Sequence, residues 1–233
     1  MSISIEELSL NAWPSHQTVL YDGWVLRFAA GFTKRANSIN PIYPSSIDLA
    51  EKINFCEELY QRRKLSVVFK LTPKTSPNEL DEQLSASGYR KNSPTSVQLM
   101  DLSSISLQNS GETNLQEELS AEWLDASSRM NAISETNRET LFQILGSIMP
   151  RHCFVSLKHE NKIIASGLGV LQSGHIGLFS IITDAAFRNH GYGQQVVNKI
   201  LEWGKQNKAQ KAYLQVELEN APALRLYSKL VFH

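Results

Sequence analysis

The stretch RNHGYG, from Arg188 to Gly193, combines residue types that can bind an anion. It precedes an amphipathic segment whose apolar residues recur at helical spacing, namely Val196, Val197, Ile200, Leu201 and Gly204. A helix is therefore expected to begin at about Tyr192, and its first backbone N–H groups would have no partner within the helix. These N–H groups and the helix dipole favour a phosphate, which glycines would allow to approach and Arg188 would pair with. A plain strand-to-helix turn with a surface arginine explains the two glycines equally well.

A second motif narrows the interpretation. The stretch is neither the three-glycine dinucleotide fingerprint nor a P-loop. Arg188 to Gly193 resembles the Arg/Gln-x-x-Gly-x-Gly/Ala acyl-CoA signature of the GNAT superfamily of N-acyltransferases. Asn220 to Phe232 resembles the family's Asn-x-x-Ala-x-x-Leu-Tyr-x-Lys-x-Gly-Phe segment, except that Val231 stands where the family usually has glycine. The resemblance covers Glu117 to His233.

The resemblance implies a site for acetyl-CoA. The end of the fourth strand would hydrogen-bond the acetyl carbonyl and the pantetheine arm, the loop would wrap the pyrophosphate, and an asparagine would reach the pantetheine from across the cleft. The implied binding residues are Ile181, Ile182, Thr183, Arg188, Asn189, His190, Gly191, Tyr192, Gly193, Gln194 and Asn220. His190 and Tyr192 are interpreted as variable loop residues that contribute only their backbone.

The resemblance also implies the reaction. An amine would attack the thioester directly, a backbone N–H would stabilise the developing oxyanion, and Tyr227 would protonate the departing CoA thiolate. Tyr227 lies at helical spacing from Leu224 and Leu230, so packing in the core is the alternative. No general base is assigned, since His175 and Glu217 are candidates only because they lie in or beside predicted strands. Neither half has metal-ligand spacing, so no metal is expected.

Strands and helices alternate along the whole chain, which predicts an α/β fold. The resemblance makes this a mixed, mostly antiparallel GNAT-type sheet flanked by helices, in a tandem arrangement. In the first half we expect a hairpin from Gly23 and then these elements: a helix over 47–65, a strand over 66–71, a short helix ending at Gly88, and strands over 89–91 and 95–102. In the second half we expect helices over 115–129 and 137–148, three strands between 151 and 183, the helix described above, a strand over 212–218 and a short helix over 220–230.

The order helix, strand, loop, short helix and aromatic residue occurs once in each half, which indicates a tandem duplication. The first copy has the loop NPIYPSSIDLAEK, in which prolines remove N–H donors and Ser45, Ser46 or Asp48 would cap the helix. Glu82 or Leu84 falls where the second copy has its tyrosine. The chain is therefore divided into a degenerate GNAT-like domain (1–102), a polar linker (103–114) and a GNAT catalytic domain that binds acetyl-CoA (115–233).

The degenerate half is expected to line the substrate cleft and complete the fold. Arg35, Asn37, Ser38 and Asn40 lie close together and could contact a substrate, or they could belong to an edge strand and its turn. The second half stops at His233, earlier than the family, which would leave a sheet edge unpaired. The first half could cover that edge, a second subunit in a homodimer could cover it, or the chain could be shortened.

The composition excludes several classes of protein. The formal net charge is zero, which argues against a nucleic-acid partner. The acidic N-terminal residues do not resemble a signal peptide, and the most apolar segment is too short to span a membrane, so a cytoplasmic protein is expected. Cys56 and Cys153 are interpreted as two buried thiols.

The leading hypothesis is an N-acetyltransferase that moves an acetyl group from acetyl-CoA to a primary amine of a small molecule or peptide. The main alternative is a non-catalytic module that binds acyl-CoA and regulates a partner. A purely structural tandem domain is a third possibility.

Overall fold

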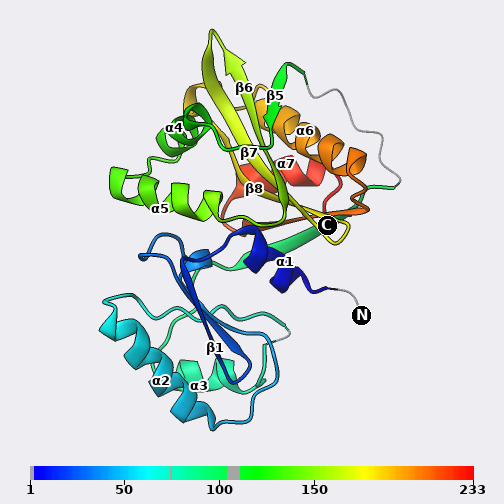
Figure 1. The fold of residues 1–233 in the computed structure, drawn as a ribbon. Coiled ribbons are helices and arrows are strands. Elements are labelled where there is room, and N and C mark those ends of the chain that lie inside the picture. The colour runs from blue at the N-terminus through cyan, green and yellow to red at the C-terminus, as the bar shows by residue number, and fades with distance from the viewer. Residues whose placement is uncertain (1–2, 74, 104–110) are drawn as a thin grey trace. The chain divides into compact units, whose positions relative to one another are not determined.

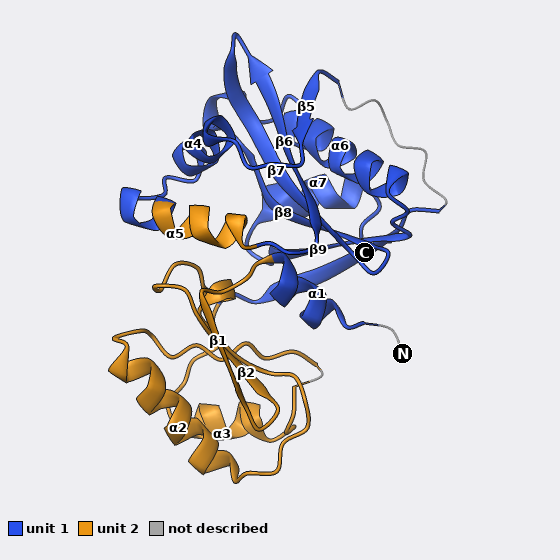
Figure 2. Cartoon of the chain, in the orientation of Figure 1, with its two compact units in different colours: residues 1–12, 93–138, 148–233 blue, residues 13–92, 139–147 orange. Residues whose placement is uncertain are grey.

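The computed structural model of the chain describes residues 3–73, 75–103 and 111–233. The chain forms two compact units, shown in different colours in Figure 2. Unit 1 contains residues 1–12, 93–138 and 148–233, and unit 2 contains residues 13–92 and 139–147. These boundaries differ from the predicted domains 1–102 and 115–233, because the N-terminal helix and residues 93–102 belong to unit 1. Most of the predicted linker, residues 104–110, lies outside the described residues.

Unit 1 is built on a six-stranded sheet with the order β4-β9-β8-β7-β6-β5. Its strands are β4 (Thr95–Asp101), β5 (Thr113–Gln116), β6 (Arg151–His159), β7 (Lys162–Gln172), β8 (His175–Thr183) and β9 (Lys211–Glu217). Neighbouring strands are antiparallel except for β8 and β9, which run parallel. The predicted mixed, mostly antiparallel sheet is therefore confirmed.

Helices cover both faces of this sheet (Figure 1). They are α1 (Ile5–Ala12), α4 (Ala121–Met130), α6 (Tyr192–Gln206) and α7 (Ala221–Lys229), while α5 (Glu135–Gly146) is divided between the two units. Successive residues on a strand point to opposite faces. The ring of Phe154 accordingly lies 5.0 Å from that of Trp123 on α4, whereas Val155 belongs to the hydrophobic core that includes the apolar side of α6.

A glycine on β7 brings α6 close to the sheet. A Cβ atom at Gly167 would lie 2.7 Å from Val196 and 3.0 Å from Ile200, both on α6. Only a residue without a side chain leaves room for the helix at this distance. The helix and its N-terminal turn are therefore held close against β7, beside the end of β8.

The edge of the sheet beyond β9 is occupied by a strand from the first half of the chain. β4 pairs with β9 along its whole length, from Thr95 opposite Glu217 to Asp101 opposite Lys211. The other side of β4 exchanges two backbone hydrogen bonds between Leu99 and His233, with N–O distances of 2.8 and 3.1 Å. Of the three alternatives for this edge, the structure supports coverage by the first half. This pairing is also the reason why residues 93–102 belong to unit 1.

The N-terminal part of the second half differs from its prediction. The helix predicted over 115–129 begins only at Ala121, because residues 113–116 pair with β6 as strand β5. The side chain of Ser120 accepts a hydrogen bond from the backbone N–H of Trp123 and so caps the helix at its observed beginning. Strand pairing has therefore overridden the helical spacing of the apolar residues before Ser120.

Unit 2 has a three-stranded antiparallel sheet with one long helix and one short helix. Its elements are β1 (Gln17–Tyr21), β2 (Trp24–Phe28), the 3-10 turn Lys34–Ala36, β3 (Ile39–Pro41), α2 (Leu49–Arg62) and α3 (Leu80–Ala86). The antiparallel pairing of β2 with β3 confirms the predicted hairpin, and β1 extends it. The strand predicted over 66–71 is reduced to an isolated parallel bridge between Ile39 and Phe69, since β3 ends at Pro41, which has no N–H to donate. The strand predicted over 89–91 does not form.

The two halves repeat the same chain path. In unit 1, α6 connects β8 to β9, and these two strands pair in parallel. In unit 2, α2 connects β3 to the segment that contains Phe69, and Phe69 forms a parallel bridge with Ile39 of β3. The short helices also end alike, because Phe232 N donates to Tyr227 O at 3.1 Å and Tyr89 N donates to Leu84 O at 3.0 Å. The predicted duplication is supported, and Leu84 is the residue that corresponds to Tyr227.

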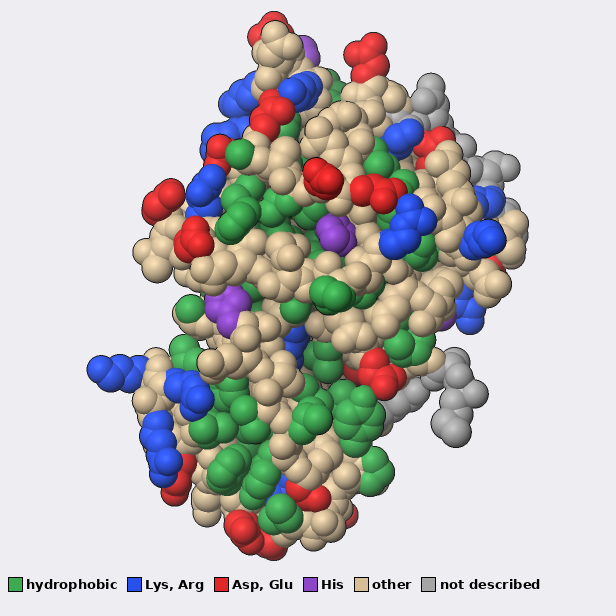
Figure 3. Space-filling model, viewed as in Figure 1, with side chains coloured by type: hydrophobic (Ala, Val, Ile, Leu, Met, Phe, Trp, Pro, Cys, Tyr) green, Lys and Arg blue, Asp and Glu red, His purple; other side chains and the backbone are tan. Residues whose placement is uncertain are grey.

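The surface and the cysteines also bear on the sequence analysis. Basic and acidic side chains are interspersed on the visible face (Figure 3), in keeping with the formal net charge of zero. Cys56 and Cys153 are buried free thiols, as predicted, and burial raises the pKa of each to about 12. Among the described helices, none is long and apolar enough to cross a membrane.

Candidate functional site

The loop from Arg188 to Gly193 leads into α6, as the sequence predicts. Gly191 is the N-cap residue and has a φ of +79°, in the left-handed region that favours glycine. In the part of the chain that the structure describes, no side chain caps the helix, and a Cβ atom at Gly191 would meet no further atom within 4 Å. The N-terminus of α6 therefore combines N–H groups not bonded by a side-chain cap with open space beside them.

Carboxylates bind the backbone N–H groups at the start of α2, the helix of unit 2 that corresponds to α6. Asp48 accepts hydrogen bonds from the N–H groups of Ala50 and Glu51 at 3.0 and 3.1 Å. Asp22 accepts from the N–H groups of Ser46 and Ile47, both at 2.9 Å. The prediction that Asp48 is an N-cap is confirmed. Protein carboxylates thus occupy the N–H groups at the start of α2 and in the turn before it, whereas α6 has no side-chain cap among the described residues.

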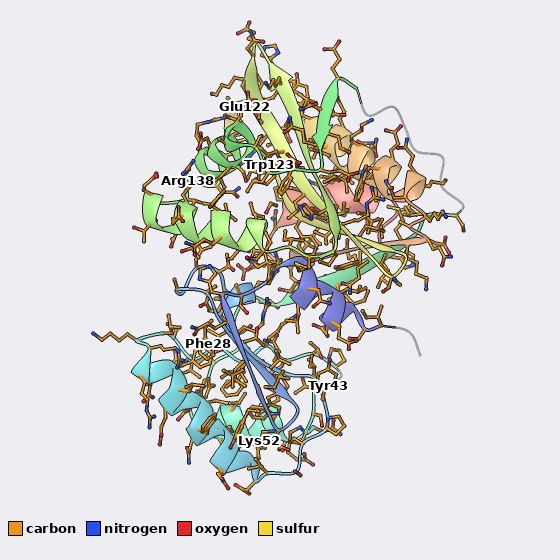
Figure 4. All side chains as sticks on the ribbon, in the orientation of Figure 1. Phe28, Tyr43, Lys52, Glu122, Trp123 and Arg138 are labelled. Atoms are coloured by element: carbon orange, nitrogen blue, oxygen red, sulfur yellow. The ribbon has the colours of Figure 1, made fainter. Side chains whose placement is uncertain are left out.

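A buried cation accompanies Asp22. Lys52 lies on α2 in unit 2 (Figure 4), its side chain is fully buried, and its Nζ lies 3.1 Å from Asp22 Oδ2 and 4.2 Å from the ring centre of Trp24. The pKa of Asp22 is held well below its usual range by hydrogen bonds from the backbone N–H groups of Ile47 and Ser46 and from the Lys52 ammonium group. The carboxylate is therefore charged throughout the neutral range and balances the buried ammonium group.

We expect Asp22→Asn to lower the thermal unfolding midpoint at pH 7, because the change leaves the Lys52 cation buried without its counter-ion. A depressed carboxyl pKa stabilises the folded state above the unfolded pKa, about 3.9, and this contribution is lost as the pH falls through the folded pKa. The difference from wild type should thus be constant between pH 5 and 7 and should shrink below about pH 4. Asp81→Asn, which breaks an exposed pair with Lys91, is the control. Equal midpoints for the two variants would contradict this account.

The strands β8 and β9 separate beside the loop. They pair only over residues 175–178 and 211–214, and the next part of β8 contains Ser180 with a φ of +49° and a shift in its register with β7. Ile182 and Thr183 still pair with β7, but in the described part of the chain no strand pairs with them on the side of β9. Their backbone groups on that side can therefore receive an extended ligand as an added strand.

Several of the predicted residues converge at this opening. A Cβ atom built on Gly193 would lie 3.3 Å from Thr183 Oγ1 and 3.5 Å from Leu226 of α7. Arg188 Nε donates to the backbone oxygen of Thr183 at 3.4 Å. The end of β8, the loop and α7 thus meet around the first turn of α6. Asn220 is the N-cap of α7, where its side-chain oxygen accepts from Ala223 N at 3.2 Å.

Tyr227 lies on α7 with 7% of its surface exposed, and its ring is 5.9 Å from that of Phe232 in the core. Burial raises the pKa of its hydroxyl to about 12, so the group stays protonated at neutral pH. Core packing and proton donation are both compatible with this position.

The loop side chains are engaged locally. His190 Nδ1 lies 2.8 Å from the backbone oxygen of Arg188, and its ring stacks 5.9 Å from that of Tyr192. Asn189 has a φ of +67°, which asparagine tolerates better than most residues. The prediction that His190 and Tyr192 contribute through the backbone stays a prediction.

The two candidates for a general base lie at opposite ends of the sheet strands. His175 begins β8, whereas the opening lies near the other end at Thr183, and its Nδ1 is 2.8 Å from Ser173 O in the preceding turn. Glu217 ends β9, beyond the part that pairs with β8. The position of His175 therefore argues against it.

The polar cluster of unit 2 binds its own backbone. Asn37 Oδ1 accepts from Ala29 N and Gly31 N at 2.8 and 2.9 Å, and Asn40 Nδ2 donates to Ser38 O at 2.9 Å. Asn37, Ser38 and Asn40 are all buried. The interpretation as strand and turn structure is favoured over substrate contact. Arg35 makes a cation–π contact, since its guanidinium carbon lies 5.6 Å from the ring centre of Trp13.

Sequence reasoning missed an ion pair beside the loop. Asp184 directly follows β8, and its Oδ2 accepts a hydrogen bond from Arg129 of α4 at 2.6 Å. Aspartate at the first position after a strand is a cap signal that could have been recognised, and Asp184 does cap the 3-10 turn Ala185–Phe187. Nothing in the local sequence marks Arg129. Among the described residues, no group of three or more His, Cys, Asp or Glu side chains could hold a metal.

A family model described as "Probable histone acetyltransferase Rv0428c C-terminal" matches residues 3–233. The chain belongs to this acetyltransferase family. It is also similar to a protein of Bacillus subtilis (strain 168) described as "Uncharacterized N-acetyltransferase YobR", with 29% identity over 235 positions that cover 98% of this chain and 93% of the relative.

Solved structures extend the similarity to the fold. A tandem GNAT protein from the clavulanic acid biosynthesis pathway superposes with a TM-score of 0.65 at 12% identity, covering 98% of this chain and 83% of that protein. A GCN5-related N-acetyltransferase from Kribbella flavida gives a TM-score of 0.64 at 12% identity, covering 94% and 86%. The chain thus belongs to an acetyltransferase family and has the fold of the GNAT proteins in a tandem arrangement.

Proposed function

We propose that the chain transfers an acetyl group from acetyl-CoA to a primary amine of a small molecule or peptide. The observation that carries this proposal is the N-terminus of α6, which has a left-handed glycine, no side-chain cap and open space for an anion. It lies beside the opening between β8 and β9, so a pyrophosphate and an extended pantetheine arm can be bound by adjacent backbone groups.

Each residue near the opening has a proposed role. The N–H groups from Arg188 to Gln194 bind the pyrophosphate, and the Arg188 guanidinium adds a charged donor. The backbone of Ile181 to Thr183 binds the pantetheine arm and orients the acetyl carbonyl. The side-chain amide of Asn220 donates to the pantetheine from α7, since its oxygen is used in capping. The co-substrate supplies the acetyl group as a thioester.

Tyr227 is the proposed general acid. Its hydroxyl is protonated at neutral pH and can give its proton to the thiolate sulfur as the amine displaces it. A backbone N–H at the end of β8 would stabilise negative charge on the carbonyl oxygen during the attack. No general base is assigned, and Glu217 at the end of β9 is the better placed of the two candidates.

An amine panel tests the proposed function. Purified protein is incubated with acetyl-CoA and with polyamines, aminoglycosides, amino acids and lysine-bearing peptides, including a histone-type peptide because of the family description. Release of free thiol, together with mass spectrometry of the acceptor, identifies the product. Binding of acetyl-CoA without transfer to any amine would favour the alternative of a non-catalytic sensor. Absence of binding would contradict both.

The difference between the two helix N-termini predicts the stoichiometry of binding. Asp48 occupies N–H groups in the first turn of α2 and Asp22 those in the turn before it, so unit 2 should bind no coenzyme. Isothermal titration should therefore give one acetyl-CoA per chain, and Asp22→Asn should not change that number or the affinity. Two equivalent sites per chain would show that the carboxylates do not exclude the ligand.

A further inference from the structure

Asp184 holds the turn between β8 and the loop in three ways. Its backbone N–H donates to Ile164 O of β7 at 2.8 Å, and its Oδ1 accepts from Ala186 N at 3.2 Å. Its Oδ2 accepts from Arg129 at 2.6 Å. One residue therefore fixes the turn through its backbone N–H and both carboxylate oxygens, and its side chain is 16% exposed.

Arg129 connects this carboxylate to the scaffold. Its second terminal nitrogen donates to Ile163 O of β7 at 2.8 Å, so one guanidinium joins α4, β7 and the turn. Lys162 lies farther from the same carboxylate, at 3.7 Å. Hydrogen bonds from Arg129 and from Ala186 N hold the pKa of Asp184 below its usual range, so the pair is charged at neutral pH.

The fixed turn leads directly into the proposed coenzyme loop. Only Ala185–Phe187 separates Asp184 from Arg188, whose Nε in turn donates to Thr183 O at 3.4 Å. Backbone donors must lie within a fraction of an ångström of their place to bind a diphosphate well, and small displacements are costly. A partly exposed ion pair contributes little to global stability, so the consequences of losing it should be concentrated in the loop.

We propose that Arg129 is a positioning residue for the coenzyme loop and acts through Asp184. The inference rests on the proposed function, because it assumes that this loop binds acetyl-CoA. Arg129→Ala should raise the Kd and KM for acetyl-CoA about tenfold, the effect of a difference of 1.4 kcal/mol, and should leave kcat at saturating acetyl-CoA within about twofold of wild type. Arg129→Lys should restore part of the affinity, since an ammonium group can reach one acceptor but not both.

A matched control is available on the same helix. Glu122, labelled on α4 in Figure 4, pairs with Lys158 of β6 at 2.7 Å, and this pair also joins α4 to the sheet. The side chain of Lys158 is exposed to the same extent as that of Arg129, whereas Glu122 is more exposed than Asp184. Lys158→Ala should leave the Kd for acetyl-CoA unchanged. Asp184→Asn, which keeps an oxygen to accept from Ala186 N but loses the charge, should follow Arg129→Ala and gives a second reading if the alanine variant does not fold.

The experiment is isothermal titration of acetyl-CoA into wild type and the four variants, with kcat and KM measured against the best amine of the panel. A tenfold loss confined to the Arg129 and Asp184 variants, with partial recovery in Arg129→Lys, is the result that we expect. If wild type binds acetyl-CoA and Arg129→Ala binds it as tightly as Lys158→Ala does, the positioning role is wrong and the proposed function stands. If wild type does not bind, the proposed function itself is wrong.

Discussion

Replacing Gly191 with alanine is expected to weaken acetyl-CoA binding about a hundredfold, equivalent to about 3 kcal/mol. A left-handed conformation costs an L-residue about 1–2 kcal/mol, so the backbone at position 191 should shift away from its φ of +79°. The added Cβ also projects into the space beside the N-terminus of α6, where no atom of another described residue lies within 4 Å, apart from its chain neighbours. Two charge-assisted hydrogen bonds to the diphosphate, worth about 1.5 kcal/mol each at the low end, would be lost. Isothermal titration measures the effect.

A second glycine provides the control for backbone strain. Gly174, in the turn between β7 and β8, has a φ of +73°, and the nearest atom of the described residues to its added Cβ is the Gln210 side-chain oxygen, at 3.9 Å. Gly174→Ala should lower the unfolding midpoint about as much as Gly191→Ala does and should bind acetyl-CoA as wild type does. If the two variants lose affinity equally, the loss at position 191 reflects destabilisation, and the loop does not hold the diphosphate.

Replacing Tyr227 with phenylalanine is expected to lower kcat by about a hundredfold or more, within the range that general acids contribute. Phenylalanine keeps the ring and its contact with Phe232 and removes only the hydroxyl, so the Kd for acetyl-CoA should stay unchanged. Steady-state kinetics with a titration on the same preparation separate the two effects. The buried Tyr213 of β9 is the control, because Tyr213→Phe removes a tyrosine hydroxyl from a strand of the sheet and leaves Tyr227 on α7 unchanged.

The pH dependence gives a second test of Tyr227. Because burial raises its pKa to about 12, the protonated form that can donate persists until the pH approaches that value. Wild-type kcat should therefore show no decrease from this group up to about pH 10. Unchanged turnover in Tyr227→Phe would assign the tyrosine to core packing alone.

The part of the site that the sequence predicts is the part encoded by neighbouring residues. The loop from Arg188 to Gly193 and the helix after it could be recognised, because glycines, a charged donor and helical spacing are all local. The exposed N-terminus of α6 then follows from the absence of Ser, Thr, Asp or Asn at its N-cap. The same reasoning found Asp48 as the cap of α2.

The contacts that the sequence did not reveal join residues far apart in the chain. Asp22 bonds the turn before α2 from 24 residues away, and Arg129 bonds Asp184 across 55 residues. The sequence predicts a linker up to residue 114 and a helix from residue 115, but pairing with β6 makes residues 113–116 a strand. Strand β4 likewise has an ordinary alternating pattern, and only the pairing with β9 places it in unit 1. Pairing partners of this kind are selected by the whole fold.

The two halves show how one framework can keep or lose a ligand site. In both halves a helix connects two chain segments that run parallel. The helix of unit 2 is capped by the Asp48 carboxylate, whereas the N-cap of α6 in unit 1 is Gly191, which has no side chain to cap it. Leu84 also stands where Tyr227 stands in unit 1, so unit 2 lacks the proposed acid as well as the proposed anion site.

The measurement that tests the central claim most directly is a crystal structure of the chain with acetyl-CoA. The account predicts diphosphate oxygens about 2.7–3.2 Å from backbone nitrogens between Gly191 and Gln194, at ordinary hydrogen-bond distance. The pantetheine arm should lie along Ile181 to Thr183 in the opening between β8 and β9. A diphosphate bound elsewhere, with the first turn of α6 facing only water, would contradict the account.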